Sequence, residues 1–186
     1  MHYSFQTRNS EIMFEENYLS STKNQFSQYR SLGEKAITQI PDEKIDWQYN
    51  PESNSIATIV KHMTGNMLSR FTDFLTSDGE KAWRNRDAEF ENEQLSREKL
   101  MARWNEGWAC LSDALEKLTG QDLSKKITIR NEEHTVMEAI NRQLTHYSYH
   151  IGQIVFIGKM ICDDQWETLS IPKGNSRIFN AKKGIL

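Results

Sequence analysis

Two of the five histidines in this 186-residue sequence, His146 and His150, are four residues apart. In a helix this spacing places both imidazoles on one face, one turn apart, where two ring nitrogens can reach the same metal ion. His62 lies far upstream, beside an apolar stripe of its own. The spacing alone leaves two interpretations, a three-histidine metal site or unrelated histidines that form hydrogen bonds at the rim of a core. Five histidines form ten possible pairs, so such a spacing can arise by chance, and the pair by itself is a weak signal that favours the second interpretation.

The elements that must position these histidines are long amphipathic helices. The chain has three prolines, and none lies between residues 52 and 171. Since proline breaks helix interiors, this stretch leaves room for long helices. Apolar residues recur at helical spacing in four segments, at about residues 10–40, 54–77, 97–118 and 135–162. Each segment has one apolar face to bury, so the sequence predicts an all-α fold, a four-helix bundle.

The helix ends carry recognisable signals. Asn54 is a suitable N-cap for the second helix, and Gly120 is expected to be a left-handed C-cap of the third. Thr135 and Glu138 match a capping box at the start of the fourth helix. Residues 126–130 alternate with period two and predict a short hairpin just before it.

The remaining chain organisation is simple. We expect one domain over residues 1–186, with the helices at about 10–162. The tail, residues 163–186, has no apolar stripe and is predicted to be irregular and to lie over the bundle. The polar connection 80–95 is predicted to be an exposed loop.

Composition narrows the class of protein. The net charge is −3, the pI is about 6.0 and the mean hydropathy is −0.72, so a basic nucleic-acid or membrane-binding surface is not expected. No apolar run is long enough to span a bilayer, and the N-terminus lacks a signal-peptide pattern. Cys110 and Cys162 are far apart and form no metal-binding motif. A cytoplasmic protein is therefore expected.

Two fragments of the sequence resemble the DinB-like family, which is also described as YfiT-like metal-dependent hydrolases. They are Ile-Ala-Thr-Ile-Val-Lys-His-Met-Thr-Gly-Asn at residues 56–66 and Leu-Thr-His-Tyr-Ser-Tyr-His-Ile-Gly-Gln-Ile at residues 144–154. The second contains the family's H-x-x-x-H-x-G-Q run, and the first contains its isolated histidine. The resemblance covers about residues 10–162.

The resemblance implies that His62, His146 and His150 bind a divalent metal ion, and it also suggests a homodimer. Three imidazoles leave at least one coordination position open, as in catalytic zinc sites. Zinc and nickel both accept imidazole, so the ligands do not identify the metal. Each ligating histidine needs a hydrogen-bond acceptor for its other ring N–H, and the candidates are Asn66, Gln143, Gln153 and Glu138.

An open metal position can activate either water for hydrolysis or a thiol for transfer. Tyr147 occupies the position where zincin proteases carry a glutamate base, which weakens the case for hydrolysis. The DinB-like family also includes members similar to bacillithiol- and mycothiol-dependent S-transferases. We therefore expect a metal-dependent S-transferase that joins a low-molecular-weight thiol to a small electrophile, the reacting group being a metal-held thiolate or water. The alternatives are a hydrolase and a non-catalytic stress or interaction protein with a structural or vestigial metal.

Other polar and aromatic residues are less informative. Arg84 and Arg86 fall in the predicted exposed loop, where they either receive an anionic substrate or keep the loop soluble, and the second interpretation is favoured. Trp104 and Trp108 are expected in the core. Tyr149 turns away from the core stripe, toward the mouth of the site or a partner.

Overall fold

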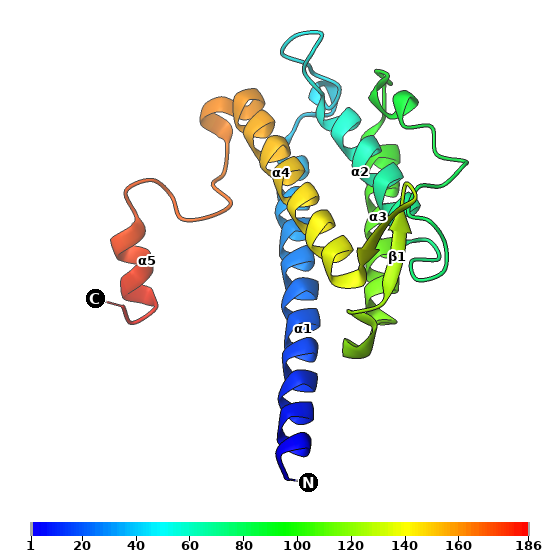
Figure 1. Cartoon of the computed structure of the whole chain (residues 1–186). Helices are drawn as coiled ribbons and strands as arrows, with labels where there is room; N and C mark the ends of the chain where they lie inside the picture. Colours follow the sequence, from blue (N-terminus) through cyan, green and yellow to red (C-terminus); the bar gives the residue numbers. More distant parts are fainter. Residues whose placement is uncertain (1, 186) are drawn as a thin grey trace.

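Four long helices account for most of the molecule (Figure 1). The structure, a computed structural model, describes residues 2–185, with side chains from residue 13 onward. Over these residues the chain is mostly helical, as predicted, with one small antiparallel sheet. The elements are α1 (His2–Gln39), α2 (Ile56–Phe71), α3 (Arg97–Glu116), β1 (Lys126–Ile129), β2 (Glu132–Thr135), α4 (Val136–Cys162) and α5 (Ser176–Lys182).

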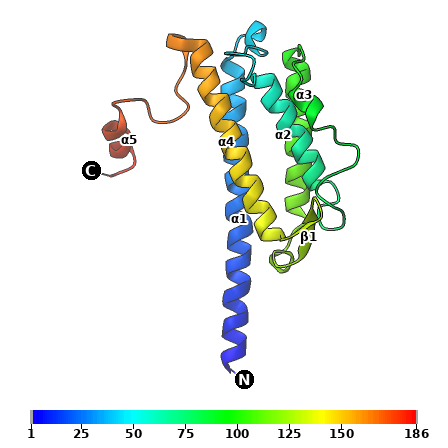
Figure 2. The same ribbon diagram turned by 45° about the horizontal axis from the view of Figure 1, so that its top comes forward.

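The long helices pack around one apolar core. α1 packs chiefly along α4, and α2 packs chiefly along α3 (Figure 2). α2 also contacts α4, so the helices that carry His62 and the His146/His150 pair are neighbours. Trp104, Trp108 and Tyr147 are the largest fully buried side chains. The two tryptophans are therefore core residues, as expected. The N-terminal part of α1 extends beyond the other three helices (Figure 1).

Helix α2 is shorter than predicted at both ends. Its N-cap is Ser55, whose side chain accepts a hydrogen bond from Thr58, and not Asn54. It ends at Phe71, because the chain turns at Asp73, where φ is 49°. Phe74 beyond the turn is still buried, and its ring centroid is 5.1 Å from that of Phe71. The apolar stripe thus continued past the end of the helix, which explains the overestimate.

The prediction for Gly120 was wrong. Helix α3 ends at Glu116, and Gly120 has no left-handed backbone; it begins a short 3-10 helix capped by Thr119. A Cβ on Gly120 would lie 2.7 Å from the Cβ of Glu15 in α1. Glycine is therefore needed at this position because α1 lies close to the backbone here, and not because a helix ends here.

The predicted hairpin and capping box are both present. β1 pairs with β2 through a turn at Arg130 and Asn131, which have φ values of 57° and 61°. Both of their backbone N–H groups donate to the carboxylate of Asp78, each at 2.9 Å. This carboxylate holds the hairpin against the connection that follows α2. Thr135 and Glu138 cap α4 reciprocally.

The tail is only partly placed as expected. Trp166 is half-buried and packs at Gly158 of α4, where a Cβ would lie 2.7 Å from its ring. From Ile171 onward the side chains are exposed, including Phe179 and Ile185. Figures 1 and 2 both show α5 standing away from the long helices. The prediction that the tail lies over the bundle is therefore wrong for this part.

Among residues 2–185, no helix combines the length and the apolar character that a membrane span requires.

Candidate metal centre

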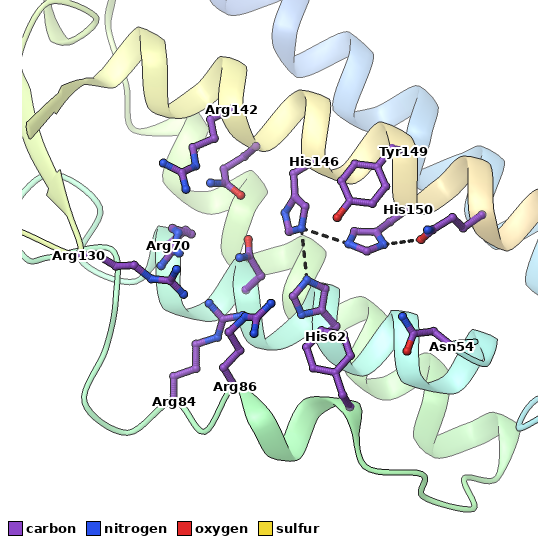
Figure 3. Close-up of a pocket in the computed structure, with 14 residues that line it drawn as sticks. Asn54, His62, Arg70, Arg84, Arg86, Arg130, Arg142, His146, Tyr149 and His150 are labelled. Carbon is purple, nitrogen blue, oxygen red and sulfur yellow. Dashed lines mark hydrogen bonds between the residues drawn. The ribbon is translucent and has the colours of Figure 1, made fainter. Parts of the chain in front are cut away.

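The three histidines of the predicted site converge from two helices. α2 presents His62, and α4 presents His146 and His150 (Figure 3). The Nε2 atom of His146 lies 3.3 Å from Nε2 of His62 and 3.1 Å from Nε2 of His150. One nitrogen from each ring falls within 4.8 Å of the others, so the group can hold a metal ion.

In two of these rings the second nitrogen, Nδ1, hydrogen-bonds to an acceptor side chain. Nδ1 of His62 lies 2.9 Å from Oε2 of Glu89, and Nδ1 of His150 lies 2.8 Å from Oε1 of Gln153. Carboxylate and amide oxygens only accept, so each Nδ1 carries the proton, and in the neutral ring Nε2 keeps its lone pair. His146 can donate one proton to one neighbour only. Of the two contacts between Nε2 atoms, at most one can therefore be a hydrogen bond, and in the other contact two lone pairs face each other. A cation between the three Nε2 atoms would bind these lone pairs.

Burial favours the neutral imidazole that a metal requires. It lowers the pKa of His146 to about 3, helped by repulsion from His150 and His62. It lowers the pKa of His150 to about 4, although the bond to Gln153 opposes the shift. Both rings are therefore neutral at pH 7, with their lone pairs available.

Glu89 is the main residue of the site that the sequence reasoning missed. It lies on a short 3-10 helix, Asp87–Phe90, in the connection between α2 and α3. Its carboxylate also accepts two hydrogen bonds from Arg84, at 2.7 and 2.9 Å. Burial raises the pKa of Glu89, but the bonds to His62 and Arg84 outweigh burial and hold it below its usual value. The pairing of an acceptor with a ligating histidine is the arrangement expected around a metal.

Gly65 leaves room for this carboxylate. It lies one turn after His62 on α2, and a Cβ there would fall 2.2 Å from Oε1 of Glu89. The glycine was the available signal, because glycine inside a helix usually marks a close approach. Nothing in the sequence names the partner, which comes from an irregular segment 24 positions downstream.

The other predicted acceptors have different roles. Asn66 accepts a hydrogen bond from the Tyr147 hydroxyl at 2.8 Å. Gln143 is buried, and among the described residues its Oε1 has no hydrogen-bond partner. Glu138 is used in the capping box of α4. Of the four candidates, only Gln153 hydrogen-bonds to one of the three histidines in the described part of the chain.

The histidines form one wall of a cavity of about 440 Å³. Asn66 and Gln143 also line it, and so does Tyr149, whose ring centroid lies 4.2 Å from that of His150. The remaining lining is rich in arginine, and Figure 3 shows these side chains gathered on the side away from Asn54. The five arginines are Arg70, Arg84, Arg86, Arg130 and Arg142.

The interpretation as a solubilising residue was wrong for Arg84, whose side chain is only 2% exposed. Arg86 is exposed, as expected, and both residues line the cavity. The connection that carries them folds back over α2 because Glu89 bonds to His62, whereas its polar composition had indicated a solvated loop.

The group stays open toward the cavity. Within the described side chains, no fourth His, Cys, Asp or Glu joins the three histidines. The thiols of Cys110 and Cys162 are free and hydrogen-bond elsewhere, to Thr72 and Gln39, and burial raises the pKa of each. The three histidines therefore leave space for a further molecule on the side that faces the cavity.

Comparison with known proteins identifies the family of the chain and assigns no activity to it. No curated protein matches the chain. Residues 13–175 match the model of a family described as protein of unknown function, DUF1572. The match runs past Cys162, where the resemblance noted in the sequence ended, and includes the first part of the tail. The chain therefore belongs to the DUF1572 family, which is a DinB-like family.

Proposed function

We propose that this protein holds a divalent cation, zinc or nickel, on His62, His146 and His150 and transfers a low-molecular-weight thiol to a small electrophile. The convergence of the three Nε2 atoms on one wall of an open cavity carries the proposal. The packing of α1 to α4 fits a DinB-type four-helix bundle, in which such a site lies between facing helices.

The cation, when bound, supplies Lewis acidity that lowers the pKa of a thiol or water placed at the open position. The chain's own residues hold and orient it. Glu89 and Gln153 fix the rotation and the tautomer of His62 and His150, so that each Nε2 faces Nε2 of His146 and would be free to hold the cation. The phenol of Tyr149, whose pKa is raised by burial, stays protonated at neutral pH and can donate a hydrogen bond at the mouth.

Thiol transfer suits this lining better than hydrolysis. Hydrolysis usually requires a general base, and among the described residues no Asp or Glu lines the cavity. Glu89, the nearest carboxylate, is occupied by His62 and Arg84. Transfer requires less from the protein: a sulfur–carbon bond forms, the leaving group departs with the bonding electrons, and the thiol proton passes to solvent.

The test combines metal analysis with an activity assay. Elemental analysis of protein purified without an affinity tag is expected to give about one zinc or nickel per chain. Metal-loaded protein is then assayed with a panel of small thiols and electrophiles. We expect turnover by the wild type and its loss in His150→Ala, which removes one ligand.

His134→Ala is the matched control, because His134 lies on β2 outside the cavity and its loss leaves the three ligands in place. It is expected to retain metal and turnover. Equal turnover by wild type and His150→Ala would exclude the proposed role of the metal. A wild type that binds metal but turns over no substrate in the panel would favour the non-catalytic alternative.

A further inference from the structure

The side of the cavity away from Asn54, next to the histidines, carries an excess of positive charge (Figure 3). Five guanidinium groups line it, and two carboxylates accompany them. Glu80 lies 3.1 Å from Arg70 and 3.0 Å from Arg130, and Glu89 binds Arg84. Neither carboxylate faces the cavity itself. The arginines therefore present more positive charge to the cavity than the neighbouring side chains neutralise.

Two of the arginines have no acidic partner within the described part of the chain. Arg86 lies over Phe90, with its guanidinium carbon 5.2 Å from the ring centroid. Arg142 lies one helical turn before His146 on α4, on the face that carries the histidines (Figure 3). Both are exposed, so a ligand group that entered the cavity would meet two guanidinium groups without an acidic partner among the described residues.

Buried polar atoms on the same side also lack partners. Nε of Arg70 and Nη1 of Arg84 are buried donors without a hydrogen bond among the described residues, and Oε1 of Gln143 is a buried acceptor in the same condition. The side chains of Arg70 and Arg84 are 5% and 2% exposed. Buried polar groups are normally satisfied, so unpaired donors and an acceptor beside one cavity favour a polar ligand at this place.

We propose that this arginine-lined side binds a carboxylate or phosphate group of a small ligand, whose remaining part extends toward the histidines. The planar guanidinium fork matches both oxyanions and binds them in a bidentate manner. Gln143 adds a requirement, since its free Oε1 needs an N–H or O–H donor on the same ligand. Identifying this ligand with the thiol or electrophile rests on the proposed function, whereas anion binding itself does not.

The shape and charge of the protein favour a small molecule over a polyanion. The arginines line a cavity of about 440 Å³, within the size range of small-ligand sites. The chain as a whole carries a net charge of −3, whereas proteins that bind nucleic acid generally present an extended basic surface. An acidic metabolite of modest size is thus the class of ligand that fits.

The test is calorimetric titration of the full chain with inorganic phosphate and, separately, with succinate, at constant ionic strength. Protein as purified and protein stripped with a chelator are both used. We expect saturable binding of at least one anion and no binding of neutral succinamide. Tighter binding of phosphate would identify a phosphate ester as the ligand, and tighter binding of succinate would identify a carboxylate.

The double variant Arg86→Gln/Arg142→Gln is expected to weaken this binding by at least about tenfold, because charged hydrogen bonds are lost. Both residues are exposed, so the fold is retained. Arg177→Gln, an exposed arginine on α5 far from the cavity, is the matched control and is expected to bind as wild type does.

Two results would overturn the proposal: absence of saturable binding of either anion, or an equal loss of affinity in the control and the double variant. Its failure can be separated from that of the proposed function with His150→Ala. This variant is expected to lose the metal and to retain anion binding, because it leaves all five arginines in place.

Discussion

The two sides of the cavity are built from different kinds of structure. The histidine side is formed by two helices, and each of its rings is carried by a regular backbone packed on the core. The arginine side is assembled from α2, the connection after it, the hairpin turn and α4. Its guanidinium groups stand on long side chains, two of which have no acidic partner among the described residues.

This difference matches the amount of geometric variation that each of the two proposed ligands, the metal ion and the oxyanion, tolerates in its binding site. A metal ion requires its ligand atoms within a few tenths of an ångström, which rigid helices and fixed ring tautomers provide. An oxyanion has several equivalent lone pairs and tolerates variation in the approach of a guanidinium. We therefore expect substitutions at the histidine side to act sharply on metal affinity and those at the arginine side to act more gradually.

The largest effect is expected from His146→Ala. Its Nε2 atom lies between the other two, at 3.3 and 3.1 Å, so its loss leaves two separated ligands. Metal affinity, measured by competition with a chromophoric chelator, should fall by more than about 100-fold, beyond the range seen for residues that only support a ligand. An unchanged affinity in His146→Ala, with His134→Ala as reference, would exclude the three-histidine site.

Glu89→Gln is expected to have the next largest effect. The amide keeps the shape of the carboxylate but loses the charge that orients His62 and pairs with Arg84. Metal affinity should fall by about 10- to 100-fold, as for other changes to a histidine's hydrogen-bond partner. Glu91→Gln, an exposed carboxylate two residues away, should leave it unchanged. Equal behaviour of the two variants would mean that Glu89 only supports the fold.

Gly65→Ala tests the same contact without removing any polar group. The added methyl group would meet Oε1 of Glu89 and push the carboxylate away from His62, so we expect a loss of metal affinity of up to about tenfold. Gly152→Ala is the matched control, because nothing lies within 4 Å of a Cβ at this helical glycine. It should keep metal affinity and raise helix stability by about 0.5–1 kcal/mol. The same affinity in both variants would show that Glu89 adapts.

The smallest effect on the site is expected from Asp78→Asn, which acts on the stability of the fold and not on metal affinity. Burial raises the pKa of Asp78, but the backbone N–H donors of Asn131, Glu80 and Arg130 outweigh it and lower the pKa well below its usual value. The charged form therefore stabilises the fold above the ordinary aspartate pKa of about 4, and this contribution is lost as the pH falls toward the folded-state pKa.

Near pH 7, urea unfolding should give a loss of about 1–2 kcal/mol in Asp78→Asn. The difference from wild type should shrink as the pH is lowered below about 4. Asp164→Asn, at an exposed position, is the control and should show neither effect. A difference that stays constant with pH would contradict the assigned role of the charge. Metal affinity is expected to stay at the wild-type value.

The features that were predictable from the sequence are those that depend on local periodicity. The spacing of apolar residues indicated the four long helices, and the capping box placed the start of α4 to the residue. The same periodicity brought His146 and His150 to one face. The position of His62 beside its own apolar stripe left a three-histidine site open, and the resemblance to a family then favoured it, because no local pattern relates two distant helices.

The features that were missed depend on tertiary contacts. Glu89 and Arg84 lie in a connection without periodicity, whose polar residues look the same in sequence whether they are solvated or folded onto a helix. Hydropathy alone predicted that no segment is long and apolar enough to span a membrane, and no helix among the described residues is. The homodimer, the cytoplasmic location and the thiol remain predictions.

The carboxylate of Glu89 touches both halves of the cavity, with His62 on one oxygen and Arg84 on both. A ligand that draws Arg84 toward itself weakens the hydrogen bonds between Arg84 and Glu89, and Glu89 is the residue that orients His62. Binding of the anion and binding of the metal ion are therefore linked thermodynamically. Linkage is reciprocal: the factor by which an occupied arginine side alters the affinity for the ion equals the factor by which the ion alters the affinity for the anion. Order of addition would therefore govern the rate of assembly but never the final occupancy.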